Sequence, residues 1–202
     1  MPLPAFAVTY DYRCPFARNA HEHLIAALMA GSGWQVTFSP FSLGQAHVEA
    51  GEVPVWENPT EAPNLLAIEA SLVVRDRYPE RFLDLHGALF TARHDEGRDL
   101  RDLEVIRGIL KESAIDADEV LAQVALGWPR ALFRTEHESM VDDHQVFGVP
   151  TFVLPGGDGV FVRLMTRPQG DGTVAKKTIE TVIGLIDQHQ EINEFKHTTI
   201  SH

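Results

Sequence analysis

The stretch Asp11-Tyr12-Arg13-Cys14-Pro15-Phe16-Ala17-Arg18 lies between two segments with different patterns. Residues 5–10 alternate large apolar side chains with smaller ones, which predicts a strand. Residues 19–30 carry apolar side chains at helical spacing, which predicts a helix. Pro15 suits the first turn of that helix, because the N–H that proline lacks would have no partner there. The only cysteine of the chain, Cys14, is therefore predicted at the N-terminus of a helix.

The position of Cys14 predicts a reactive thiol. Free N–H groups and the positive end of the helix dipole stabilise a thiolate more than a neutral thiol, so we expect a pKa below the value of about 8.5 of a free thiol. Arg18 is unfavourable to the dipole at a helix start, which suggests that its charge serves the thiolate or an anionic ligand. The alternative is a buried, inert cysteine that behaves as a small apolar residue.

The segments around this helix predict a βαβ unit. Residues 34–41 alternate again, so a second strand follows the helix and ends at Pro40. A strand, a helix and a strand in this order form a right-handed unit with parallel strands. Residues 42–62 contain glycines and prolines without periodicity, and we expect a loop near the site.

A helical segment interrupts this pattern. Between Pro63 and Val146 the apolar residues recur at helical spacing only, in five runs separated by turn residues. Asp99 and Asp116 are expected to cap the third and fourth of these helices. The run lengths differ, which excludes a repeat array.

The strand pattern then returns. Residues 148–154 form a short apolar run, and Gly156-Gly157-Asp158-Gly159 joins it to Val160-Phe161-Val162-Arg163-Leu164, which predicts a β-hairpin. Residues 179–186 carry the apolar stripe of a last helix. The expected fold is α/β, with a mixed sheet built from a βαβ unit and a hairpin. Its expected parts are an N-terminal half-domain over 1–62, an all-helical insertion over 63–145 and a C-terminal half-domain over 146–202.

Composition narrows the class of protein. The net charge of -12 opposes nucleic-acid binding, since phosphates would be repelled. One cysteine excludes an internal disulfide and suits a reducing compartment. Residues 1–4 have neither the basic nor the apolar segment of a signal peptide, and no apolar run reaches the length of a membrane span. We expect a soluble, cytoplasmic protein that binds neither nucleic acid nor a membrane.

The order of these elements resembles the DsbA-like branch of the thioredoxin superfamily over nearly the whole chain. Cys14-Pro15-Phe16-Ala17 matches the Cys-x-x-Cys site of that family, and Val149-Pro150 matches its cis-proline. The resemblance implies a thioredoxin-like fold in which a cis Pro150 lies opposite Cys14 and the backbone of Val149 pairs with an extended substrate. Cys14 is the expected nucleophile. The expected substrate-binding residues lie around it and include Arg18 because of its charge: Pro15, Phe16, Arg18, Val149, Pro150 and Thr151.

Ala17 departs from the family pattern. It replaces the resolving cysteine of the dithiol enzymes, so a mixed disulfide on Cys14 would need an external thiol for its release. The same spacing, with serine in place of Cys14, resembles the related kappa-class glutathione transferases and hydroxychromene-carboxylate isomerases. The sequence thus lies between two branches.

Three functions remain open at this point. The first is a thiol-disulfide oxidoreductase that acts through Cys14 on a disulfide-containing protein or a small thiol, with release by glutathione, mycothiol or a partner protein. The second is an isomerase or transferase that depends on such a thiol, with Cys14 only orienting it. The third is a non-catalytic peptide-binding module. No tightly bound cofactor is expected, and a homodimer is left open.

Other candidate residues favour structural roles. His21 and His23 are two positions apart, which suits a solvated pair better than a metal pair, and no metal site is expected. His86 lies in an apolar stripe and is expected to be a core or groove histidine rather than a base. Phe16, Phe41 and Trp56 are either core residues or the lining of an apolar groove beside Cys14.

Overall fold

The structure is a computed structural model that describes residues 5–194, 196–197 and 199. Its strands form one mixed sheet in the order β2-β1-β3-β4, and these strands are β1 (Ala5–Tyr10), β2 (Gln35–Pro40), β3 (Thr151–Val153) and β4 (Gly159–Phe161). Strands β1 and β2 are parallel, whereas β3 is antiparallel to both β1 and β4. The predicted βαβ unit and hairpin are therefore present, and the fold is the expected thioredoxin-like α/β fold.

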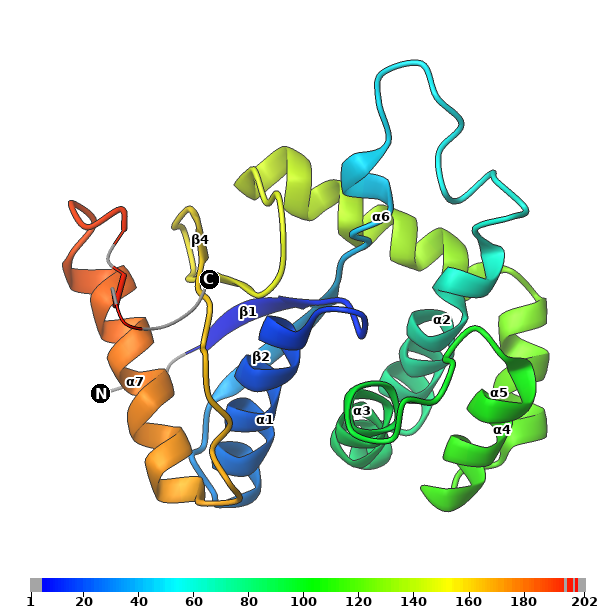
Figure 1. The fold of residues 1–202 in the computed structure, drawn as a ribbon, viewed down its shortest axis with the longest axis horizontal. Helices are drawn as coiled ribbons and strands as arrows, with labels where there is room; N and C mark the ends of the chain where they lie inside the picture. Colours follow the sequence, from blue (N-terminus) through cyan, green and yellow to red (C-terminus); the bar gives the residue numbers. More distant parts are fainter. Residues whose placement is uncertain (1–4, 195, 198, 200–202) are drawn as a thin grey trace.

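The helices fall into two groups. Helices α1 and α7 pack side by side, α1 also contacts β1, and five further helices come between β2 and β3 in sequence. In Figure 1, α7 lies on one side of the sheet and α2 to α5 gather on the other, while α6 leads back toward β3. The helices are α1 (Pro15–Met29), α2 (Ala62–Arg77), α3 (Pro79–His94), α4 (Leu103–Glu112), α5 (Ala117–Ala125), α6 (Trp128–His144) and α7 (Gly172–Gln188).

Helix α1 begins where the sequence predicts. Cys14 is its N-cap and Pro15 is its first residue, where the missing N–H of proline is no loss. The buried face of α1 includes Ala17, Ala20 and Leu24, which are fully covered. The small side chains of Ala17 and Ala20 allow the helix to lie close to its neighbours, and this packing fixes the start of α1, where Cys14 lies.

Capping side chains explain where two helices of the insertion begin. Asp116 accepts hydrogen bonds from the backbone N–H groups of Asp118 and Glu119 and caps α5, as predicted. The prediction that Asp99 caps the preceding helix is wrong, because Asp102 is the N-cap of α4 and accepts from the N–H of Glu104. Asp99 instead accepts from the N–H of Arg101, in the turn before the helix.

The segment 42–62 is a loop with one short 3₁₀ helix, η1 (Gln45–His47). Figure 1 shows the loop projecting away from the sheet and the helices beyond η1. Its beginning stays close to the predicted site, since the N–H of Leu43 donates to Asp11 Oδ2 over 3.0 Å. The prediction that this loop lies near the site is confirmed for its first residues.

Two further observations concern the whole chain. None of the helices in the described ranges is long and apolar enough to cross a membrane. Residues 1–4, on which the signal-peptide prediction rests, lie outside the part of the chain that the structure describes.

Candidate active site

Cys14 lies at the junction of β1 and α1, opposite the loop that precedes β3. Its Sγ is 3.4 Å from the carbonyl oxygen of Val149 and 3.5 Å from the N–H of Ala17. The thiol donates to the first of these groups, and the sulfur accepts from the second. The peptide bond between Val149 and Pro150 is cis. The structure therefore brings Cys14, Val149 and Pro150 together, and Phe16 follows within the same helical turn.

The predicted low pKa of Cys14 is wrong for this structure. Burial raises the pKa of the thiol, because only 8 % of the residue is exposed and a thiolate there would lose its hydration. The N–H groups of Ala17 and Phe16 lower the pKa, as the helix argument requires, but by less. The hydrogen bond from the thiol to Val149 also favours the protonated form. Cys14 is a neutral thiol in the resting structure.

The turn before Cys14 is held by Asp11. This carboxylate is buried, forms an ion pair with Arg13 and accepts from the backbone N–H groups of Arg13 and Leu43. The N–H of Cys14 donates to the carbonyl oxygen of Asp11 over 3.0 Å, which closes the turn. The charge of Asp11 raises the pKa of Cys14, which opposes the helix effect. The turn is therefore rigid, and its acidic residue is largely neutralised by Arg13.

Thr9 fixes the proline loop, which comprises residues 145–150 and leads into β3. Its hydroxyl donates to the carbonyl oxygen of Gly148 over 3.4 Å and accepts from the N–H of Thr151 over 2.9 Å. Thr151 also donates its own hydroxyl to Gly148 over 2.8 Å. Because all three residues are buried, these bonds hold the loop on β1. Thr151, a predicted substrate residue, is thus occupied in shaping the loop.

The arginine near Cys14 is Arg163 and not Arg18, the residue that the sequence suggests. The guanidinium of Arg18 forms ion pairs with Glu22 and Asp95, so the structure does not support its predicted role beside the thiolate. The cation that lowers the pKa of Cys14 is Arg163, which follows β4. Its guanidinium carbon lies 5.3 Å from the ring centre of Phe16. Sequence reasoning missed Arg163, because only the hairpin pairing brings it to the site.

A buried chain of hydrogen bonds runs behind the turn. His21 Nε2 lies 3.0 Å from the carbonyl oxygen of Thr9, His21 Nδ1 lies 2.8 Å from His86 Nε2, and His86 Nδ1 lies 2.8 Å from the Tyr12 hydroxyl. A carbonyl oxygen only accepts, so His21 donates to Thr9, His86 donates to His21, and Tyr12 donates to His86. Burial lowers the pKa of His21 to about 4 and that of His86 well below its usual range, which keeps both rings neutral.

These contacts correct the prediction for His21 and His23 and confirm the one for His86. His21 and His23 are not a solvated pair, since both are buried, and His23 Nδ1 bonds to the carbonyl oxygen of Asn19. His86 is a core histidine, as expected. The buried partner of His21 is His86, 65 positions away in the chain, and the sequence does not show that contact.

Of the three aromatic candidates, two are core residues and one lies at the site. Phe41 and Trp56 are buried and pack against His137, with ring centres 4.4 and 5.6 Å away, so they are core residues. Phe16 is half-buried and lies under Arg163. Within the described residues, no group of three or more His, Cys, Asp or Glu side chains has the arrangement of a metal site.

A cavity of about 460 Å³ adjoins the same turn on the side of the insertion. Asp11, Tyr12 and Arg13 form one wall, and residues of α2 and of the segment after α3 form the rest. His94 at the end of α3 contacts the carbonyl oxygen of Tyr12 at 2.9 Å. The insertion therefore covers the back of the turn, and the thiol faces the proline loop.

Comparison with known proteins agrees with this geometry. The family model of the DSBA-like thioredoxin domain matches residues 7–169. The chain belongs to this family. No curated protein matches the sequence significantly. The matched region includes the Cys14 turn, the whole helical insertion and the hairpin, so members of the DSBA-like family share the frame that holds the site.

Solved structures with the same fold are distant in sequence. A probable DsbA oxidoreductase from Streptomyces coelicolor is 17% identical with a TM-score of 0.61, and the match covers 96% of this chain and 93% of that one. A DsbA variant from Pseudomonas aeruginosa is 18% identical with a TM-score of 0.59, covering 95% and 90%. The cytosolic disulfide reductase DsbM from Pseudomonas aeruginosa with GSH is 15% identical with a TM-score of 0.60, covering 89% and 98%. At these identities the matches show the shared fold alone.

Proposed function

We propose that this protein is a cytoplasmic thiol-disulfide oxidoreductase that acts through the single thiol of Cys14. The observation that carries the proposal is the position of Cys14 Sγ, at the start of α1 and 3.4 Å from the carbonyl oxygen of Val149. An extended substrate that pairs with the backbone of Val149 would have its disulfide next to this sulfur. Membership of the DSBA-like family supports the same chemistry.

The reaction proceeds in two exchanges. After Cys14 loses its proton to water, its thiolate attacks one sulfur of the substrate disulfide. A bond forms between the two sulfurs, the substrate S–S bond breaks, and the departing sulfur leaves as a thiolate that takes up a proton. Ala17 offers no second thiol, so an external thiolate attacks the substrate sulfur of the mixed disulfide and releases Cys14. One substrate sulfur is thereby released as a thiol, and the other leaves in a disulfide with the external thiol. A second molecule of the external thiol reduces that disulfide, so the substrate ends with two thiols and the two external thiols end as one disulfide.

The residues around Cys14 have defined parts in this proposal. Pro15 and Phe16 form one side of the approach to the sulfur, and Val149 and Pro150 form the other. Thr151 holds the loop in place through Gly148. Arg18 is not included, because Glu22 and Asp95 already neutralise it. The external thiol is of the glutathione or mycothiol class, and the neighbouring structure of DsbM with GSH supports that choice.

The raised pKa of Cys14 favours a second candidate, a thiol-dependent isomerase or transferase. A neutral thiol that turns its one proton from Val149 toward a bound thiol cofactor can orient that cofactor without attacking anything, as a serine hydroxyl would. In this case the chemistry belongs to the bound thiol. The two candidates therefore differ in what happens when the sulfur is replaced by oxygen.

The test is the reduction of insulin by glutathione in the presence of wild-type protein, Cys14→Ser and Cys14→Ala. We expect the wild type to accelerate the reduction and both variants to fall to the uncatalysed rate, because neither can form a mixed disulfide. If glutathione-dependent isomerisation or conjugation of a model substrate survives in Cys14→Ser while insulin reduction is absent in the wild type, the second candidate is correct. If neither insulin reduction, nor any mixed disulfide, nor glutathione-dependent turnover is found, the result favours the peptide-binding module.

A further inference from the structure

Arg163 occupies a fixed position beside the thiol. The N–H of Val162 donates to the carbonyl oxygen of Pro150 over 3.1 Å, and Asn19 Nδ2 donates to the carbonyl oxygen of Leu164 over 2.8 Å. The backbone on either side of Arg163 is thus tied to the proline loop and to α1, the two elements that face each other across Cys14. An arginine between these bonds has little freedom to leave the site.

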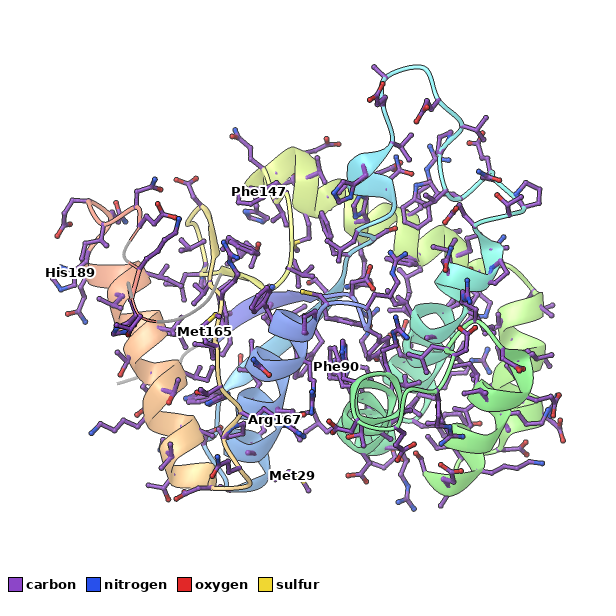
Figure 2. All side chains as sticks on the ribbon, in the orientation of Figure 1. Met29, Phe90, Phe147, Met165, Arg167 and His189 are labelled. Carbon is purple, nitrogen blue, oxygen red and sulfur yellow. The ribbon has the colours of Figure 1, made fainter. Side chains whose placement is uncertain are left out.

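The guanidinium of Arg163 lies over two aromatic rings. Its central carbon is 5.3 Å from the ring centre of Phe16 and 5.7 Å from that of Phe161. Contacts of this kind hold the planar group over the ring faces and leave its N–H groups free at the edge. Phe161 also contacts Phe147, which is 71 % exposed and leads into the proline loop in Figure 2. The cation is therefore set in an exposed apolar surface next to Cys14.

Arg163 also lacks the partner that most arginines of this acidic chain have. Within the described ranges it forms no ion pair with a carboxylate, and Arg81 and Arg93 are the other arginines of which this is true. The side chain of Arg163 is exposed, so a solute can reach it. Its positive charge lowers the pKa of Cys14, although burial has the larger and opposite effect.

We propose that Arg163 is an anion-binding residue of the Cys14 site, which selects disulfides and thiols that carry a carboxylate close to their sulfur. This inference rests on the proposed oxidoreductase function and adds the substrate class to it. A carboxylate accepts two parallel hydrogen bonds from a guanidinium, while the rings below exclude water from one side of the pair. The sulfur of such a molecule would then lie toward Cys14, between Phe16 and the proline loop.

The experiment compares three small disulfides that differ in charge: the anionic dithiodipropionate, the neutral bis(hydroxyethyl) disulfide and the cationic cystamine. The rate at which each forms a mixed disulfide with Cys14 is followed by intact mass, for wild type, Arg163→Gln and Arg163→Lys. Arg81→Gln is the matched control, since Arg81 is exposed and unpaired among the described residues and lies at the end of α3 remote from His94 and the turn. Thermal unfolding of each variant confirms that it is folded.

Arg163→Gln should slow the reaction of Cys14 with dithiodipropionate roughly threefold to tenfold more than its reaction with bis(hydroxyethyl) disulfide. It should slow the reaction with cystamine least, and added salt should reduce the differences between the three disulfides. The comparison between disulfides removes any change in the thiolate fraction, which affects all three equally. Arg163→Lys should retain part of the preference and Arg81→Gln all of it. An equal effect on all three disulfides would overturn the anion site and leave the oxidoreductase proposal intact. Failure of the wild type to react with any of them would overturn both.

Discussion

Cys14 shows how two local effects on one thiol compete. Its helix position supplies N–H groups that stabilise the thiolate, and burial under the proline loop stabilises the thiol more strongly. A higher pKa does not end thiol chemistry. Each unit of increase lowers the thiolate fraction about tenfold below the pKa but makes the thiolate itself roughly threefold more nucleophilic, so the net loss is only about threefold.

The pH dependence of alkylation tests the state of this thiol. Because the pKa of Cys14 is raised, the rate constant for reaction with iodoacetamide should still be rising at about pH 8.5, where a free cysteine is half ionised. The same protein unfolded in urea provides the reference curve, which should level off at lower pH than the folded protein. A plateau at or below neutral pH in the folded protein would show that the helix effect outweighs burial after all.

Helix α7 supports the site through its close approach to α1. A Cβ atom on Gly172, the first residue of α7, would lie 2.5 Å from the Cβ of Ala30 and 2.9 Å from the carbonyl oxygen of Ala26. Neither neighbour is the flexible end of a side chain, so the helices would have to separate. Since α1 carries Cys14 at its other end, its packing against α7 also sets the position of the sulfur.

Two glycine substitutions on α7 test this contact against helix propensity. Gly172→Ala should destabilise the protein by about 1–3 kcal/mol through overpacking. Gly184→Ala is the control on the same helix, because its Cβ would meet nothing within 4 Å. It should stabilise the protein by about 0.5–1 kcal/mol, since alanine is the better helix residue. Urea unfolding gives both values, and equal stability of the two variants would refute the close contact.

The two parts of the molecule are joined by buried polar bonds as well as by apolar packing. His86 of α3 bonds to both His21 and Tyr12, so the helical insertion contacts the helix that carries Cys14 and the turn before it. The Tyr10 hydroxyl bonds to Ser71 of α2 over 3.0 Å. The insertion therefore fixes the back of the active-site turn, while the proline loop fixes its front.

Sequence reasoning succeeded where the cause is local. The start of α1 at Pro15 follows from proline geometry, the hairpin follows from a glycine-rich turn, and the cap at Asp116 follows from one side chain. Asp99 shows the limit of this reasoning, because an aspartate three residues later competes for the same role.

The failures share a different cause. The burial of Cys14, the inward position of His21 and the approach of Arg163 all depend on segments far apart in the sequence. Hydrophobic periodicity reports which face of an element is covered, but it does not report which segment covers it. The sequence shows an arginine within the predicted second hairpin strand, but it shows neither that Arg163 lacks an ion pair nor that the strand register brings it to Phe16.

The account depends most on one claim, that Cys14 forms a mixed disulfide which an external thiol can release. Incubation with oxidised glutathione followed by intact mass measurement tests it directly, because Cys14 is the only cysteine. We predict a mass increase equal to one glutathionyl group, its loss on addition of reduced glutathione, and no increase for Cys14→Ser. An unchanged mass for the wild-type protein across the pH range in which its thiol ionises would contradict the claim.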